Sequence, residues 1–268
     1  MLRKNVFILF LGWISIGSTY AQELQATHPN AKGSSLRLEI LPIKHLDVGK
    51  NTVLKFRIIN LNDQKALKLN ELKEVHTKKL HLLVIDSSLS DYQHIHPTKS
   101  NYKDEFEFNF TPKLNNMYRI WADVTPLATN HQEYVMTEVG IQPKKQAHID
   151  KTLKTVTVLE GYTFTLKLDD ALAGQAVMGQ ITVSKDNKPF TQLEPVMGAF
   201  AHIVAFSEDY NSVLHIHPMG KEPTKESDRG GPVLEFHLEP QTAGFVKLFA
   251  QVRINGKDLF VPFGLFVK

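Results

Sequence analysis

Residues 81–97 read HLLVIDSSLSDYQHIHP, and residues 202–218 read HIVAFSEDYNSVLHIHP. Each stretch has an apolar run, a short polar segment and a second run that ends in His-x-His-Pro. This order of residues predicts two antiparallel strands joined by a tight loop. Because both stretches follow the pattern H-x12-H-x-H-P, the chain contains an internal repeat. The two copies lie 121 residues apart (202 − 81). A repeat unit of more than about a hundred residues indicates a domain duplication and not a solenoid.

The repeat continues downstream of the histidines. Residues 106–112 (FEFNFTP) correspond to residues 234–240 (LEFHLEP), and residues 117–124 (MYRIWADV) correspond to residues 245–252 (FVKLFAQV). The offset between the copies rises from 121 (202 − 81) to 128 (240 − 112), so the second copy has a loop that is seven residues longer. Surface loops tolerate such insertions. The polar residues 142–148 are the expected linker between the copies.

Short stretches of alternating apolar and polar residues predict strands throughout the chain. They lie at residues 36–40, 53–58, 106–110, 155–158, 162–168 and 179–183. Turns are expected at residues 186–189 and at 254–257, the second within a hairpin, and a short helical stretch is expected near residues 65–75. Two units with about seven strands each predict an all-β protein of two tandem immunoglobulin-like antiparallel β-sandwich domains. Small closed barrels are the alternative.

The first 21 residues have the composition of a signal peptide. Arg3 and Lys4 precede an apolar run over residues 6–16, and small residues follow it. An uncleaved anchor is the alternative, although the run is shorter than the roughly 20 residues that a comfortable span needs. We therefore expect a signal peptide at 1–21, one β-sandwich domain at 22–143 and a second at 144–268. The expected location is periplasmic or secreted, with no membrane span after leader cleavage.

The composition excludes some classes of function. The net charge is +3, and it falls to +1 without Arg3 and Lys4, so the chain lacks the basic block of a nucleic-acid-binding protein. The chain has no cysteine, so an exported form would owe its stability to packing and not to disulfides. Any soft metal ion would have to be held by histidine and methionine.

The spacing of the histidines predicts that each triplet lies on one face of its hairpin. With a four-residue loop at residues 87–90, His81 lies opposite His96, and Leu83 lies opposite His94. Opposed residues share a face, and so do residues two apart on one strand. The three imidazoles could then converge on one ion at about 2.0–2.1 Å per bond. A one-residue bulge would place them on different faces.

The candidate metal ligands therefore come from both copies of the repeat. Two methionines near the second triplet are weaker candidates, because a buried methionine more often fills space in a core. A methionine beside histidines would favour copper(I), so copper ranks before zinc. The sequence offers no acidic residue directly beside either triplet to orient the rings. The candidate ligands are His81, His94, His96, His202, His215, His217, Met197 and Met219.

The chain resembles a family of exported, mostly uncharacterised bacterial proteins with a duplicated H-x12-H-x-H-P motif. The resemblance rests on residues 80–84 (LHLLV), on Leu89, Tyr92 and the residues 94–97 (HIHP), and on residues 194–198 (EPVMG) before the second copy. Such proteins are similar to small periplasmic immunoglobulin-like proteins that bind copper or other heavy metals. The resemblance implies the same fold and a role in binding metal ions.

Three hypotheses of function follow from the sequence. The first is an exported metal-handling protein that binds copper, or zinc as the second choice, through the histidine triplets. The second is a metal-free immunoglobulin-like interaction module that binds a partner protein in the cell envelope. The third is a metal-dependent enzyme, but the chain has no HExxH helix, nucleophile elbow, P-loop or dinucleotide motif. We therefore expect a binding protein that is not an enzyme.

Overall fold

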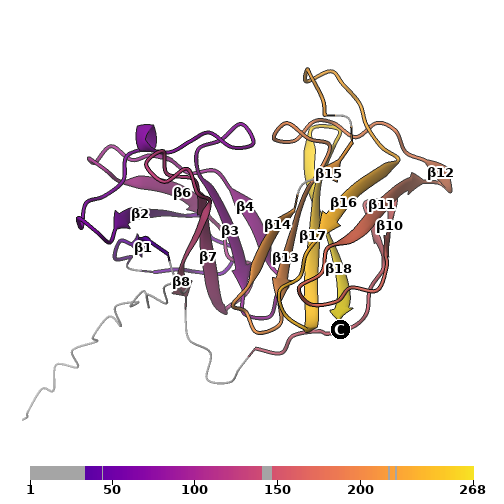
Figure 1. Cartoon of the computed structure of the whole chain (residues 1–268), viewed down its shortest axis with the longest axis horizontal. Helices are drawn as coiled ribbons and strands as arrows, with labels where there is room; N and C mark the ends of the chain where they lie inside the picture. Colours follow the sequence, from indigo (N-terminus) through magenta and orange to yellow (C-terminus); the bar gives the residue numbers. More distant parts are fainter. Residues whose placement is uncertain (1–33, 44, 141–146, 217, 221) are drawn as a thin grey trace, which may run out of the picture.

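The computed structural model describes residues 34–43, 45–140, 147–216, 218–220 and 222–268 (Figure 1). The expected signal peptide at 1–21 and the expected domain boundary between residues 143 and 144 lie outside these residues. No helix within the described part of the chain is long and apolar enough to cross a bilayer.

The first domain contains two antiparallel four-stranded sheets. One sheet has the strand order β1-β2-β6-β5, and the other has the order β4-β3-β7-β8. A single turn of 3-10 helix, η1, falls within the stretch expected to be helical. The elements are β1 (Leu36–Ile40), β2 (Thr52–Asn60), η1 (Leu69–Glu71), β3 (His81–Asp86), β4 (Tyr92–Ile95), β5 (Thr98–Lys99), β6 (Phe106–Phe110), β7 (Met117–Val124) and β8 (Glu133–Gly140).

The second domain repeats this arrangement with two additions. Its sheets have the orders β15-β16-β11-β10-β9 and β14-β13-β17-β18, and β12 pairs with β11. Strands β9 and β12 have no counterpart among the described residues of the first domain. The elements are β9 (Val156–Leu159), β10 (Tyr162–Leu168), β11 (Val177–Lys185), β12 (Lys188–Pro189), β13 (His202–Ser207), β14 (Val213–Ile216), β15 (Pro218–Met219), β16 (Val233–Leu238), β17 (Gly244–Ile254) and β18 (Lys257–Val267).

The order of the strands is that of an immunoglobulin-like sandwich. Such a sandwich has strands A, B, E and D in one sheet and C, F and G in the other. Strands β1, β2, β6 and β5 of the first domain take the places of A, B, E and D, and β3, β7 and β8 those of C, F and G. The predicted tandem β-sandwiches are therefore confirmed. The closed-barrel alternative is wrong, because the strands of each domain divide into two separate sheets.

The hairpin turn predicted at residues 254–257 has the backbone geometry that its sequence favours. Asn255 and Gly256, with φ of 51° and 72°, connect β17 to β18 directly, and Ile254 pairs with Lys257. Two successive residues at positive φ are typical of the two-residue hairpin turns that match the twist of the strands. The hairpin expected at residues 254–257 is confirmed.

Each domain has its own apolar core between its two sheets. Alternate residues of each strand point into this core, as in β1, whose residues alternate between buried and half-buried. The first core includes Leu38, Phe56, Phe110, Tyr118 and Ile120. The second includes Phe164, Ile181, Phe236, Leu248 and Phe263.

A third apolar cluster lies between the two domains. Strands β3 and β13 are buried along their whole length, which requires cover on both faces. In β3, Leu82 and Val84 belong to the core of the first domain, whereas Leu83 and Ile85 belong to the third cluster. The sheets of β3 and β13 therefore pack against each other at the centre of the molecule (Figure 1). The buried members of this cluster are Leu83, Ile85, Leu89, Tyr92, Trp121, Met136, Val204, Phe206 and Phe249.

Polar contacts hold one end of this interface. The Tyr210 hydroxyl of the second domain donates to the backbone carbonyl of Ile85 at 2.8 Å. Burial raises the pKa of Tyr210 well above its ordinary value, so the hydroxyl keeps the proton that it donates. Arg119 of β7 pairs with Glu138 and also donates to the carbonyl of Tyr210. These contacts fix the relative position of the two central sheets.

We expect the substitution Trp121→Ala to destabilise the docked arrangement of the two domains. Trp121 is 2% exposed, and its ring lies 5.6 Å from that of Phe206 in the other domain. Removing a buried tryptophan side chain should cost about 3–5 kcal/mol in the free energy of unfolding, measured by chemical denaturation. Val158→Ala, at a side chain that is 68% exposed, is the control and should cost less than about 0.5 kcal/mol. A loss below about 1 kcal/mol for Trp121→Ala would contradict a packed interface.

Candidate metal centre

The hairpin of β3 and β4 has the register that the sequence predicts. Leu82 pairs with Ile95, and Leu83 pairs with His94, with no bulge between them. Leu83 belongs to the cluster between the domains, so His94 and the other two histidines of the triplet share the face that looks toward the second domain. The prediction that the three histidines share one face of the hairpin is confirmed. The structure shows that this face looks toward the second domain.

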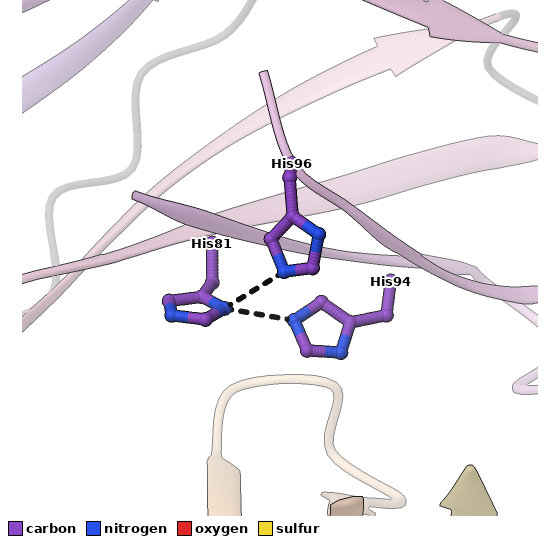
Figure 2. Close-up of side chains that lie close together, drawn as sticks. All are labelled: His81, His94 and His96. Carbon is purple, nitrogen blue, oxygen red and sulfur yellow. Dashed lines mark hydrogen bonds between the residues drawn. The ribbon is translucent and has the colours of Figure 1, made fainter. Parts of the chain in front are cut away.

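The three imidazoles of the first triplet converge on a small volume. The Nδ1 atom of His81 lies 3.2 Å from Nε2 of His94 and 3.1 Å from Nε2 of His96 (Figure 2). One nitrogen from each ring lies within 4.8 Å of the others, so the group could hold a metal ion. His81 is buried at 2% exposure, whereas His94 and His96 are half-buried. An ion would therefore enter from the side of β4.

The nitrogen separations fit ligands of one ion. Ligands at about 2.0–2.1 Å from a tetrahedral ion are separated from one another by about 3.3–3.4 Å. A right angle between two ligands at the same bond length gives about 2.8 Å. The two observed separations of 3.1 and 3.2 Å lie between these values. The rings could thus bind an ion with small shifts of their side chains.

A backbone carbonyl fixes the proton position on His81. Its Nε2 atom lies 3.0 Å from the carbonyl oxygen of Val75. A carbonyl oxygen only accepts, so Nε2 carries the hydrogen and Nδ1 of the neutral ring presents a lone pair to the other two rings. The carbonyl is presented by a tight turn in which His76 and Thr77 have φ of 52° and 66°. A β-branched residue at positive φ is strained, so this turn is held by its surroundings.

A side chain of the second domain makes the corresponding contact with His94. The Nδ1 atom of His94 lies 3.0 Å from Oε1 of Gln251 on β17. An amide oxygen also only accepts, so Nδ1 of His94 carries the hydrogen and its Nε2 presents a lone pair. The facing Nδ1 of His81 and Nε2 of His94 are then both lone-pair donors at 3.2 Å. Two lone pairs at this distance repel each other unless a proton or a metal ion lies between them.

The second triplet is described only in part. Ile203 pairs with Ile216, which is the register predicted from the repeat. His202 on β13 is buried at 1% exposure, and its ring centre lies 5.7 Å from that of His94 and 5.6 Å from that of His76. His217 and the side chain of His215 lie outside the described residues. The structure therefore places His202 beside the first triplet, at the junction of the domains.

The two methionines occupy different surroundings. Met197 has φ of 53° in the turn before β13, the position that His76 occupies in the first domain, and it is half-buried. Met219 on β15 is 52% exposed.

Sequence reasoning missed two polar residues of the site, Asp123 and Gln251. Asp123 pairs with His81 across β3 and β7, and Gln251 pairs with His202 across β13 and β17, so the two positions correspond in the repeat. Both side chains are buried, at 5% and 4% exposure. Asp123 accepts hydrogen bonds from Gln132 at 2.8 and 3.0 Å. The signal that could have revealed them is a single polar residue within each of the apolar runs at residues 120–124 (IWADV) and 248–252 (LFAQV).

The chain belongs to the family of a domain of unknown function, DUF8832, which matches it twice, over residues 30–140 and 155–268. The two matches agree with the internal repeat. The description of the family assigns no activity. No curated protein matches the chain.

Several solved structures are similar to the chain at low identity. A trypsin-activated alpha-2-macroglobulin from Escherichia coli is 13% identical, with 89% of this chain and 16% of that chain covered and a TM-score of 0.29. The D00-D0 domain of intimin is 14% identical, with 86% and 99% covered and a TM-score of 0.23. A DUF4785 family protein from Legionella pneumophila is 10% identical, with 92% and 64% covered and a TM-score of 0.27. These TM-scores are too low to support an argument about function.

We expect His81→Ala to remove the ion-binding capacity of the first triplet. His81 contacts both other rings, so its loss leaves two ligands, and the affinity for Cu(II) or Zn(II) should fall at least about a hundredfold. Isothermal titration calorimetry would measure the affinity. His131→Ala, at an exposed histidine outside the site, should leave it unchanged. Equal affinities of the His81→Ala variant and the unsubstituted protein would show that the triplet is not the binding site.

Proposed function

We propose that this protein is an exported metal-handling protein that binds copper, and zinc more weakly, through its histidine triplet. The observation that supports the proposal is the convergence of three ring nitrogens: Nδ1 of His81 lies 3.2 Å from Nε2 of His94 and 3.1 Å from Nε2 of His96. The hydrogen bonds to Val75 and Gln251 hold the lone pairs of His81 and His94 toward the centre of the site. Where both rings are neutral, a metal ion can take the place of the proton between these nitrogens.

The choice of copper follows from the chemistry of the donors. The site offers imidazole nitrogens, and for a given set of nitrogen ligands Cu(II) binds more tightly than Zn(II). The nitrogen separations lie between those expected for right-angled and tetrahedral coordination, so the geometry permits either ion. The chain has no cysteine, so no thiolate competes for the ion. Met197 and Met219 stay candidates for a copper(I) form of the site.

We also propose that the protein binds its ion without transforming a substrate, in the periplasm or outside the cell. The amino-terminal sequence of a charged segment, an apolar run and small residues supports export. The sequence motifs of hydrolases, nucleotide-binding enzymes and dinucleotide-dependent enzymes are absent from the whole chain. A binding role requires only ligands for the ion, and the three imidazoles of the triplet provide them.

Added Cu(II) should raise the melting temperature of the mature protein, residues 22–268, more than Zn(II) does. At a free ion concentration about a hundred times Kd, binding should stabilise the folded state by about 2.7 kcal/mol. Scanning calorimetry would measure the shift. A variant in which His81, His94 and His96 are all alanine should show no shift. A well-folded protein that responds to neither ion would rule out metal binding and favour the metal-free interaction module.

Metal binding should weaken as the pH falls from 7 to 5. Imidazole has an ordinary pKa of about 6.5, and a protonated ring cannot coordinate an ion. Protons and the metal ion therefore compete for the same lone pairs, and the apparent affinity should fall at least about tenfold over this range. Competition titrations at several pH values would measure it. An affinity for Cu(II) that is the same at pH 5 and pH 7 would exclude coordination by the histidines.

A further inference from the structure

A chain of hydrogen bonds in the second domain ends on His94 of the first domain. The Nε atom of Arg253 donates to Oδ1 of Asp258 at 2.6 Å, and its Nη2 atom donates to Oδ2 at 3.2 Å. The side-chain amide of Gln251 donates through Nε2 to Oδ2 of Asp258 at 3.0 Å. The Oε1 atom of the same amide lies 3.0 Å from Nδ1 of His94. These hydrogen bonds join a surface ion pair to a half-buried candidate ligand, His94.

The donor and the acceptor of each hydrogen bond in this series follow from which groups can donate and which can only accept. Arginine only donates, and an ionised carboxylate only accepts. The hydrogen bond to Asp258 raises the pKa of Arg253 above its ordinary value, as expected for a fully charged pair. The amide of Gln251 must therefore turn its NH2 group toward Asp258. Its oxygen is then left facing His94, whose Nδ1 must carry the hydrogen.

The opposite arrangement is disfavoured by electrostatics. If Nδ1 of His94 lost its hydrogen, the amide of Gln251 would have to turn its NH2 group toward the ring. Its oxygen would then face the carboxylate of Asp258, and two acceptors at 3.0 Å repel each other. The charge of Asp258 thus acts through Gln251 on the proton of His94.

The position of the amide is fixed by the packing between the domains. Gln251 is 4% exposed and lies two residues after Phe249, which belongs to the third apolar cluster. Residues two apart on a strand share a face, so Gln251 continues the interdomain face of β17. Its reach to His94 therefore depends on the docking of the two sheets.

We propose that the second domain contributes a positioning side chain, Gln251, to the metal site of the first domain. Gln251, held by Asp258 and Arg253, is a positioning residue that keeps the hydrogen of His94 on Nδ1 and leaves Nε2 available to the ion. This inference rests on the proposed metal-binding function and adds that the affinity of the triplet depends on the second domain.

The test is the substitution Asp258→Asn in the full chain. The oxygen of the new amide would keep the shorter bond, from Nε of Arg253, and its NH2 group would take the place of Oδ2 and face Gln251. The longer bond from Nη2 of Arg253 to Oδ2 would be lost. Gln251 must then turn its oxygen toward the new amide and its NH2 group toward His94. The hydrogen of His94 should move to Nε2, into the metal site, and the affinity for Cu(II) should fall about tenfold to a hundredfold.

Two measurements are made on each protein. Nitrogen-15 NMR of the metal-free protein reports which ring nitrogen of His94 carries the hydrogen, and calorimetric titration with Cu(II) reports the affinity. Asp170→Asn, a change of the same charge at a side chain that is 79% exposed, should alter neither. Gln251→Leu keeps the pair of Arg253 and Asp258 and removes the acceptor of His94, so it should also lower the affinity and leave both tautomers populated.

The outcomes separate this inference from the proposed function. An unchanged His94 tautomer together with an unchanged affinity in Asp258→Asn and in Gln251→Leu would overturn the inference while metal binding stands. If the unsubstituted protein does not bind Cu(II) or Zn(II), the proposed function fails, and the NMR result still decides whether Asp258 sets the tautomer. If Asp258→Asn does not fold, Gln251→Leu alone decides the matter.

Discussion

The structure depends on the burial of two strands, β3 and β13, on both of their faces. Each strand gives alternate side chains to the core of its own domain and the remaining ones to the cluster between the domains. The shared face is apolar in its middle and polar at both ends. Arg119 contacts Tyr210 at one end, and the other end holds the buried residues His81, Asp123, His202 and Gln251. This end of the face buries the rings of His81 and His202 and leaves those of His94 and His96 half-buried. The candidate metal centre is a product of the way in which the two sandwiches pack.

Much of the fold could be predicted from sequence because its determinants are local. The alternation in residues 36–40, 106–110 and 162–168 corresponds to β1, β6 and β10 with the same boundaries. The register of the hairpin of β3 and β4 followed from the length of one loop and a period of two residues. The convergence of His81, His94 and His96 followed from that register, and the structure brings these three residues together.

The contribution of the second domain to the site could not be predicted, because it depends on which two faces meet. Gln251 is 157 residues from His94 in the chain, and no local pattern connects them. A signal for two-sided burial was nevertheless present in residues 82–85, an unbroken apolar run where a half-exposed strand would alternate. The two methionine candidates stay a prediction from closeness in sequence; Met219 lies on β15 with its side chain 52% exposed.

The same patch of each domain meets its counterpart in the other. Leu83 and Val204, Ile85 and Phe206, and Trp121 and Phe249 are equivalent positions of the repeat, and all belong to the cluster between the domains. This is the self-complementary contact of a two-fold symmetric dimer. In a dimer of separate, identical chains, every substitution would appear on both sides of the axis at once. Because the two copies are joined in one polypeptide, that restriction does not apply, and the equivalent positions hold Asp123 in the first half and Gln251 in the second. A nearly symmetric contact can therefore carry an asymmetric cluster of side chains.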